Sequence, residues 1–285
     1  MIHYPGAKGQ IAKTIISLFP EDYPSMSYIE PFGGSAKILY IKEPSSLEVY
    51  NDNNRFLYCV YKCIQDNNCA DELLRRLTFT LNHEDIFYDS QEKIKEIKNK
   101  DFRGIPIVDI AYYVIITSVM SFNGTGNGYS AVAKHYNKRY NSHTQVAFER
   151  LVDWHNRLRR VVILNRDFRE VINKFNDENF FIYADPPYFY GVNYSYILYS
   201  DKNNTWSKED HHDLANLLRA HKGLFCLSID ICPEIKKLYK GFNLYVIKSR
   251  KNPNYEVSGT EYVEGVITNY DANVDNKNIL GARIL

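Results

Sequence analysis

The chain has 285 residues, of which 45% are hydrophobic and 24% are charged, a composition typical of a globular protein that is long enough to bury a sizeable core. The 35 basic and 34 acidic side chains leave a net charge of only +1, which by itself disfavours a nucleic-acid partner because such proteins often carry a large basic excess. The first residues show no basic segment followed by an apolar run, and no apolar stretch approaches the ~18 residues that span a bilayer, so we expect neither a signal peptide nor a membrane span.

Strands and helices alternate near the N-terminus. The pattern predicts a strand at Ser27–Glu30 and a helix at Ser35–Ile41. A second predicted strand covers Leu47–Tyr50, and Asn54–Gln65 carries apolar residues at helical spacing. A strand, a helix and a strand within about 40 residues form a βαβ unit, which indicates a parallel sheet.

The same alternation returns in the second half of the chain. Val161–Leu164 is a predicted strand and Phe168–Phe175 a predicted helix, and the apolar run Phe180–Ala184 is typical of a strand buried on both faces. The remaining predicted elements are a helix that opens with a capping box at Ser207–Asp210 and ends near His221, a strand at Leu224–Ile229, and two closing strands at Phe242–Lys248 and Tyr262–Asn269.

Between about Cys69 and His143 the alternation stops. This stretch contains a charged helix at Gln91–Lys100, an apolar helix at Ile107–Met120, and a loop rich in glycine and asparagine at Phe122–Tyr129. It indicates an inserted, mostly helical subdomain.

These elements together predict an α/β fold with a mostly parallel sheet and a closing antiparallel strand. We expect one domain formed by residues 1–68 and 144–285, which the mostly helical subdomain at 69–143 interrupts.

A turn of small residues follows the first predicted strand, at Glu30-Pro31-Phe32-Gly33-Gly34-Ser35-Ala36. Small residues there let the backbone approach a ligand closely at the carboxyl end of a sheet. Asp52 ends the next strand, where an acid is placed to hydrogen-bond a ribose hydroxyl pair. The two features indicate an adenosine-bearing cofactor, either NAD or S-adenosylmethionine. A glycine turn is also common without a ligand, and Asp52 could cap the next helix instead of binding a ribose, or do both.

The sharpest signal in the chain is Asp185-Pro186-Pro187-Tyr188, directly after the apolar strand. Two prolines cannot simply extend a strand, and they form a rigid platform at the carboxyl edge of the sheet. The Asp185 carboxylate and the Pro186 carbonyl offer acceptors, and Tyr188 offers an aromatic face. Two acceptors beside a ring fit a planar group with an exocyclic amino group, such as a flipped nucleobase. The plainer alternative is a rigid turn after the strand.

These residues resemble the amino-methyltransferases of nucleic acids, and the order of the motifs resembles the class alpha DNA adenine-N6 methyltransferases, the Dam family. Over essentially the whole chain, the segments that carry the resemblance are Tyr4–Lys8, Glu30–Ala36, Asn51-Asp52, Asn165–Phe168, Asp185–Tyr188 and Glu264–Tyr270. Tyr4 stands where several relatives have tryptophan, Ala36 where glycine is common, and Gly265 where relatives often have a larger residue. None of these departures removes a group that the chemistry needs, so we expect an active enzyme.

The resemblance implies a Rossmann-like methyltransferase fold and a site-specific, adenine-specific DNA methyltransferase. A flipped adenine would stack on Tyr188, while Asp185 and the Pro186 carbonyl accept hydrogen bonds from its N6 amino group. These three residues are the expected catalytic residues. Positioning and electrostatics would supply most of the catalysis, since the sulfonium of the cofactor is already a strong electrophile.

The resemblance also implies S-adenosylmethionine as the cofactor and S-adenosylhomocysteine as the product. Asp52 would hold the ribose, Asp167 would accept from the adenine amino group of the cofactor, and Lys8 would lie near its methionine carboxylate. The expected cofactor-binding residues are Tyr4, Lys8, Glu30, Pro31, Phe32, Gly33, Gly34, Ser35, Asp52, Asp167, Phe168 and Asp185.

Double-stranded DNA is the partner that the resemblance implies, with the inserted subdomain as the target-recognition part. From Lys134 to Arg160 there are seven basic and two acidic side chains, a local excess that phosphate contacts require. The part at 150–160 is equally explained by the solvated face of a helix. The residues expected to bind DNA are Asn123, Lys134, Tyr136, Lys138 and Arg139. We expect a monomer of bacterial or phage origin without a membrane partner.

The spacing of cysteine and histidine indicates neither a disulfide framework nor a metal site. The five cysteines contain no CxxC pair, so we expect reduced thiols, as in a cytoplasmic protein. His211 and His212 stand at a predicted helix start and are expected on the solvated surface. We therefore expect no metal.

Three other interpretations stay open. The chain could be an amino-methyltransferase that acts on cytosine N4 or on RNA, although Asp185 favours adenine. It could also be an inactive DNA-binding member of the same fold, against which the intact Asp185, Tyr188 and Asp52 argue. An NAD-dependent dehydrogenase would share the glycine turn and Asp52, but it has no use for the platform at Asp185–Tyr188.

Overall fold

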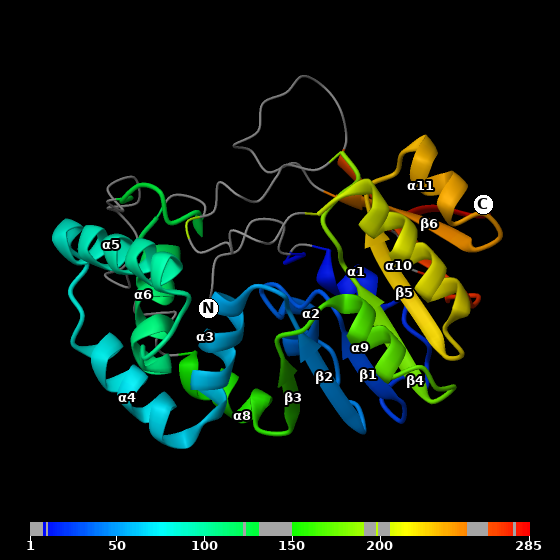
Figure 1. Ribbon diagram of the computed structural model, residues 1–285. Coiled ribbons are helices and arrows are strands. Elements are labelled where there is room, and N and C mark those ends of the chain that lie inside the picture. Colours follow the sequence, from blue (N-terminus) through cyan, green and yellow to red (C-terminus); the bar gives the residue numbers. More distant parts are fainter. Residues whose placement is uncertain are drawn as a thin grey trace. The chain divides into compact units, whose positions relative to one another are not determined.

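The computed structural model describes residues 8–9, 11–121, 124–130, 150–190, 198, 206–249, 262–275 and 278–285 (Figure 1). The chain forms two compact units. The helical unit consists of Met1–Ala7, Asn53–Asn165 and Asn193–Thr205, and the sheet unit consists of Lys8–Asp52, Arg166–Val192 and Trp206–Leu285.

The strands of the sheet unit form a sheet in the order β2-β1-β4-β5-β7-β6-β8, and β3 belongs to the helical unit. Their bounds are β1 Ser27–Glu30, β2 Leu47–Asn51, β3 Val161–Leu164, β4 Phe180–Ala184, β5 Leu224–Ile229, β6 Asn243–Ser249, β7 Tyr262–Thr268 and β8 Ile279–Ile284. Strand β1 pairs in parallel with β2 and β4, and β4 pairs in parallel with β5. Strand β7 runs antiparallel to β5 and β6, and β8 runs antiparallel to β6. The predicted α/β class with a mostly parallel sheet and antiparallel closure is confirmed.

Parallel pairing brings the carboxyl ends of β1, β2, β4 and β5 to the same edge of the sheet. The turn after β1, Asp52 after β2 and Asp185 after β4 therefore all belong to that edge. Ligands of open parallel sheets bind at this edge, which makes it the place to look for a site.

The helices of the sheet unit are α1 Ala12–Ile16, α2 Lys37–Ile41, α9 Phe168–Lys174, α10 Lys208–Ala220 and α11 Pro233–Leu238. Helices α9 and α10 lie side by side over the sheet (Figure 1). The predicted capping box of α10 is confirmed, because the Ser207 side chain accepts from the Asp210 N–H while the Asp210 carboxylate accepts from the Ser207 N–H. Each bond satisfies a donor that the first helical turn leaves unpaired.

A cluster of aromatic side chains lies in the core of the sheet unit. The ring of Phe19 lies 4.8 Å from that of Phe181, 5.6 Å from that of Tyr183 and 6.2 Å from that of Tyr28, measured between centroids. Phe181 and Tyr183 come from β4, whose residues from Phe181 to Ala184 are all buried. The prediction of a strand buried on both faces is confirmed.

The helical unit contains helices α3 Arg55–Gln65, α4 Asn67–Thr78, α5 Glu84–Lys100, α6 Ile107–Val119 and α8 Leu151–Leu158. Helix α3 packs against α4, α6 and α8 and buries seven side chains of its eleven residues. Helix α8 buries Leu151, Trp154 and Leu158 while Asp153 stays exposed, so the segment at 150–160 does contain an amphipathic helix.

One expectation about the cysteines is wrong. Cys63 at the end of α3 and Cys69 in α4 form a disulfide, with Cα atoms 5.0 Å apart. The chain reverses between the two helices at Asp66, whose side chain caps α4, and this reversal brings together two cysteines whose spacing matches no common motif. Cys59, Cys226 and Cys232 are free and buried.

Among the residues that the structure describes, no helix combines the length and the apolar character that crossing a membrane requires.

Candidate active site

The segment after β1 is a tight turn held against β2. The Gly33 N–H donates to the Asn51 carbonyl oxygen (2.8 Å), and the Tyr50 hydroxyl donates to the Gly34 carbonyl oxygen (2.9 Å). A Cβ atom at Gly33 would lie 2.0 Å from a carbon of the Tyr50 ring, so this position admits only glycine. Gly34 and Ala36 have φ angles of 48° and 52°. Glycine adopts this left-handed conformation freely, whereas alanine at position 36 bears a cost of about 1–2 kcal/mol.

Asp52 lies directly after β2 and fixes this turn. Its Oδ2 accepts a hydrogen bond from the Gly34 N–H at 2.7 Å. The side chain that caps α3 is that of Asn54, whose Oδ1 accepts from the Phe56 N–H at 3.0 Å. The alternative that Asp52 caps the following helix is therefore wrong.

Asn51, the last residue of β2, joins two of the predicted motifs. Its side chain is fully buried. The Nδ2 atom donates to the carbonyl oxygens of Pro31 (2.9 Å) and Arg166 (3.0 Å), and Oδ1 accepts from the Arg166 N–H (3.0 Å). One buried amide thus ties the turn after β1 to the segment before α9. A polar residue that ends an apolar strand was the signal for this role, which sequence reasoning did not assign.

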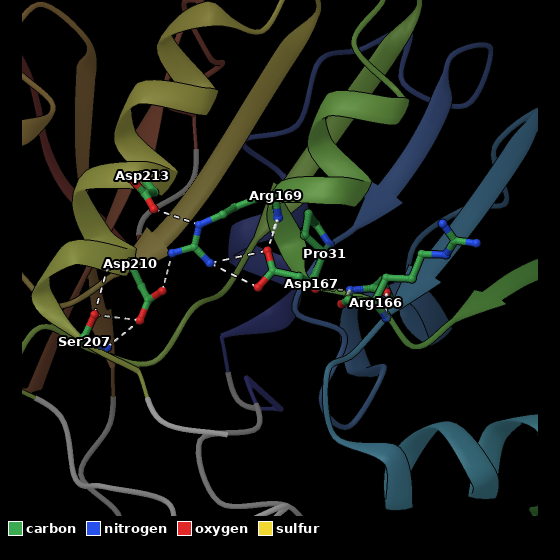
Figure 2. Close-up of polar contacts among 8 residues, drawn as sticks. Pro31, Arg166, Asp167, Arg169, Ser207, Asp210 and Asp213 are labelled. Atoms are coloured by element: carbon green, nitrogen blue, oxygen red, sulfur yellow. Dashed lines mark hydrogen bonds and ion pairs between the residues drawn. The ribbon is translucent and has the colours of Figure 1, made fainter. Parts of the chain in front are cut away.

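Asp167 caps α9 and lies in a cluster of charges (Figure 2). Its Oδ1 accepts from the Arg169 N–H at 2.8 Å, and its Oδ2 lies 3.1 Å from the Arg169 guanidinium. Arg169 also pairs with Asp210 and, at 2.7 Å, with Asp213 of α10. Burial alone would lower the pKa of Arg169, but the facing carboxylates raise it above its usual value. Asp167 remains two-fifths exposed at this edge of the site.

Three aromatic rings gather beside Asp167. The rings of Phe32 and Phe168 lie 5.2 Å apart, and the ring of Trp206 lies 5.3 Å from each of them. The Arg169 guanidinium lies 4.4 Å from the centroid of the Phe168 ring. Sequence reasoning selected Phe32 and Phe168 and missed Trp206, which no motif includes.

His211 is buried, and the expectation of a solvated position is wrong for it. Its Nε2 accepts from the Trp206 indole N–H at 2.7 Å, and its ring lies 5.0 Å from that of Phe189. Burial lowers the pKa of His211 to about 4, so the imidazole is neutral near pH 7. The reason is its place on the inner face of α10; His212, one residue later, is exposed as expected.

Asp185 follows β4 and accepts two hydrogen bonds at one oxygen. The Lys8 ammonium donates to Oδ1 at 2.6 Å, and the Ser228 hydroxyl of β5 donates to Oδ1 at 3.0 Å. Pro186 is buried and Tyr188 is partly exposed. The loop beyond Tyr188 is held by Asp230, whose Oδ1 accepts from the Phe189 N–H at 2.9 Å. Ser228 and Asp230 were not among the predicted site residues.

Lys8 connects the Asp185–Tyr188 motif to β7. Its ammonium donates to the Tyr188 hydroxyl at 3.1 Å, lies 4.9 Å from the centroid of that ring, and lies 3.5 Å from the Glu264 carboxylate. The Tyr188 hydroxyl in turn donates to Glu264 Oε2 at 2.7 Å. Burial would lower the pKa of Lys8, but the carboxylates of Asp185 and Glu264 raise it above the usual value, so the side chain is a cation. Burial raises the pKa of Glu264.

Of the remaining predicted residues, some are described by the structure and the others lie outside its described part. Glu30 is buried and accepts from the Tyr28 hydroxyl at 2.5 Å, while Ser35 is partly exposed in the glycine turn. The residues that lie outside the described part of the chain are Tyr4, Asn123, Lys134, Tyr136, Lys138 and Arg139. Among the described residues, no group of three or more histidine, cysteine or acidic side chains is placed to hold a metal ion.

Comparison with known proteins shows which proteins this chain is similar to. A protein of Paramecium bursaria Chlorella virus NC1A named Type II methyltransferase M.CviBI is 25% identical over 252 residues, which cover 85% of this chain and 86% of the relative. A protein of Methanocaldococcus jannaschii named Type II methyltransferase M.MjaIII is 25% identical over 274 residues, which cover 89% of this chain and 92% of the relative. Residues 4–252 match the family model of the D12 class N6 adenine-specific DNA methyltransferases. The Rossmann-like α/β sheet with its antiparallel closing strands suits that match, and the chain belongs to the D12 class of N6 adenine-specific DNA methyltransferases.

Proposed function

We propose that this protein transfers a methyl group from S-adenosylmethionine to the N6 amino group of an adenine flipped out of double-stranded DNA. The observation that carries the proposal is the common edge of β1, β2 and β4, where the glycine turn, Asp52 and the Asp185–Tyr188 motif follow neighbouring parallel strands. The proposed cofactor site and the proposed acceptor of the amino group would thereby share one edge of the sheet. Membership of the D12 class supports both the cofactor site and the acceptor for the amino group.

The residues around the glycine turn suit the adenosine part of the cofactor. Asp52 holds the Gly34 backbone with one oxygen, and the Tyr50 ring fills the space where a Gly33 side chain would lie, so the turn is fixed from both sides. The rings of Phe32 and Phe168 offer apolar faces to a purine. When bound, S-adenosylmethionine would supply an electrophilic methyl group. The assignments of the ribose to Asp52 and of the adenine amino group to Asp167 follow from the resemblance.

The Asp185–Tyr188 motif would orient the target amino group. Because Lys8 and Ser228 both donate to Asp185 Oδ1, we assign Asp185 Oδ2 and the Pro186 carbonyl to the two N6 hydrogens. This geometry localises the N6 lone pair away from the ring and directs it at the methyl carbon. N6 would form a bond to the methyl carbon as the carbon–sulfur bond breaks and its electron pair passes to sulfur, so that S-adenosylhomocysteine leaves and one N6 proton passes to solvent water. The Tyr188 ring would stack on the flipped base.

The helical subdomain at 69–143 and the basic residues Lys134, Lys138 and Arg139 would bind DNA, together with Asn123 and Tyr136. Cations of this kind contact phosphates and position the duplex, while a few polar side chains read bases. Residues 1–68 and 144–285 would form the catalytic domain. We propose that one chain acts as a monomer.

The direct test is methylation of duplex DNA of mixed sequence with S-adenosylmethionine, followed by digestion to nucleosides. We expect N6-methyladenine as the product, and no product from Asp185→Ala, which should still bind S-adenosylhomocysteine by calorimetry. If the product is N4-methylcytosine, or if RNA is methylated in preference to DNA, the substrate is not the adenine of DNA that we propose. Binding of DNA and cofactor without any methyl transfer would show an inactive DNA-binding protein.

A further inference from the structure

The buried carboxylate of Glu264 has no role in the mechanism above. It lies in β7, two residues before the buried Val266, and it is 1% exposed. A buried carboxylate costs several kcal/mol of desolvation, and apolar residues of similar volume often serve stability as well or better. Stability alone is therefore a poor reason for an acid at this position.

The contacts of Glu264 point to the reaction instead. Its Oε2 accepts from the Tyr188 hydroxyl at 2.7 Å, and its carboxylate lies 3.5 Å from the Lys8 ammonium. The same ammonium donates to Asp185 Oδ1 at 2.6 Å. Glu264 thus contacts two groups of the proposed site. One is the hydroxyl of the Tyr188 ring, on which the base would stack. The other is the Lys8 ammonium, which donates to Asp185, the proposed acceptor for the amino group of the base.

We infer that Glu264 is a positioning residue for methyl transfer, which fixes the plane of the Tyr188 ring and the placement of Lys8 against Asp185. The inference rests on the proposed function, since Tyr188 and Asp185 are the residues that would touch the target base. Three segments meet at this point: the N-terminal segment at Lys8, the loop after β4, and β7. Among the residues that the structure describes, Lys8, Asp185 and Tyr188 are the charged or titratable groups that face Glu264.

The protein offers a matched control for this contact. Glu234 of α11 accepts from the Tyr190 hydroxyl at 2.5 Å, and Tyr190 is 64% exposed. The pair Tyr190–Glu234 therefore repeats the tyrosine–glutamate contact at the surface, two residues beyond Tyr188. Glu234→Gln should leave kcat and KM unchanged.

The experiment compares the full-length wild type with Glu264→Gln, Tyr188→Phe and the double variant on duplex DNA. We expect Glu264→Gln to lower kcat by about 10- to 100-fold, because small errors in the placement of reacting groups cost this much. Its affinity for S-adenosylhomocysteine and its melting temperature should stay close to those of the wild type. Because Tyr188→Phe removes the other end of the same contact, the double variant should be little worse than the poorer single variant.

The pH profile separates positioning from a general structural role. Protonated wild-type Glu264 is neutral, as the glutamine is, so the ratio of wild-type to Glu264→Gln kcat should narrow as pH falls. Because burial raises the pKa of Glu264, this change should occur above the usual range of a carboxyl group. A constant ratio across pH would overturn the inference.

The other possible outcomes of the experiment also test the inference about Glu264. Equal kcat for Glu264→Gln and wild type, or fully additive effects in the double variant, would overturn the inference while the proposed function stands. A loss of kcat matched by equal losses of cofactor affinity and melting temperature would show a structural role and also overturn it. If Glu264→Gln does not fold, Tyr188→Phe decides, since unchanged kcat there contradicts the inference. A wild type that transfers no methyl group to DNA would overturn the proposed function and the inference together.

Discussion

Asp52 binds the glycine turn through one carboxylate oxygen, which accepts from the Gly34 N–H at 2.7 Å. Its removal should both loosen the turn and remove the proposed ribose acceptor. We therefore expect Asp52→Ala to weaken binding of S-adenosylmethionine by about 10- to 100-fold, since hydrogen bonds to charged groups contribute about 1.5–3 kcal/mol. Isothermal titration calorimetry measures this affinity directly.

The control for Asp52→Ala is Asp153→Ala, which removes an exposed acid from α8. It should bind the cofactor as the wild type does. An affinity of Asp52→Ala equal to that of this control would contradict the assignment of the ribose to Asp52.

The Lys8 ammonium lies between two carboxylates, at 2.6 Å from Asp185 and 3.5 Å from Glu264. Lys8→Met leaves buried negative charge without this partner and should lower the free energy of unfolding by about 3–5 kcal/mol near neutral pH. Burial raises the pKa of Glu264, so the folded protein binds this proton more tightly than the unfolded chain. The stability that this group contributes therefore falls as pH rises through the raised pKa.

It follows that the loss caused by Lys8→Met should shrink when pH is lowered to about 5, where more of Glu264 is neutral and needs no cation. Urea unfolding of both proteins at the two pH values measures the difference. Lys13→Met, which removes an exposed cation of α1, should have little effect at either pH. A loss that grows toward acid pH would contradict the role of Lys8 as the partner of Glu264.

At the scale of elements, the turn between β1 and α2 depends on the absence of a side chain at one position. The Cβ atom of Gly33→Ala would lie 2.0 Å from a Tyr50 ring carbon, and Tyr50 is a fully buried residue of β2 that cannot move away easily. We expect Gly33→Ala to lose about 1–3 kcal/mol of stability and most of its affinity for the cofactor. Thermal unfolding and calorimetry check the two effects.

Gly281→Ala provides the matched control, since a Cβ atom there meets nothing within 4 Å. Its melting temperature and its affinity for the cofactor should equal those of the wild type. If both glycine variants behave alike, the close approach of Tyr50 does not determine the turn.

Elements with strong local patterns were predictable from the sequence. The strands at Ser27–Glu30, Val161–Leu164, Phe180–Ala184 and Leu224–Ile229 agree with β1, β3, β4 and β5 residue for residue. Strand β8 escaped prediction because its residues from Leu280 onward are exposed and Gly281 interrupts it, so no apolar alternation marks it. The first turns of α5, at Glu84–Asp89, were not predicted either, because Phe87 is the one buried residue among them and no apolar repeat marks the helix there.

At the scale of the whole molecule, a net charge of +1 hides an uneven distribution of charge. If the basic stretch at 134–139 binds phosphates, log Kd for DNA should rise linearly with log salt concentration. Replacement of Lys134, Lys138 and Arg139 by alanine should reduce this slope by between about 2 and 3. Fluorescence anisotropy with a labelled duplex over a range of salt concentrations measures it.

The charge-matched control replaces Lys236, Lys237 and Lys240 by alanine, which removes three cations outside the basic stretch. An equal reduction of the slope in both triple variants would show that net charge alone, and no local phosphate contact at 134–139, governs the affinity.

The sequence by itself determined the α/β class, most of the strands and the residues at their carboxyl ends. These follow from local periodicity and turn chemistry, which act over a few residues. The tertiary structure alone decided which of those residues meet. Lys8 and Asp185 are 177 positions apart, and Tyr188 and Glu264 are 76 apart, so no local pattern could pair them. The disulfide of Cys63 with Cys69 and the burial of His211 against Trp206 likewise depend on how helices pack. Side-chain contacts between distant segments arise only once the parallel strands bring their ends to one edge, and there the candidate active site is formed.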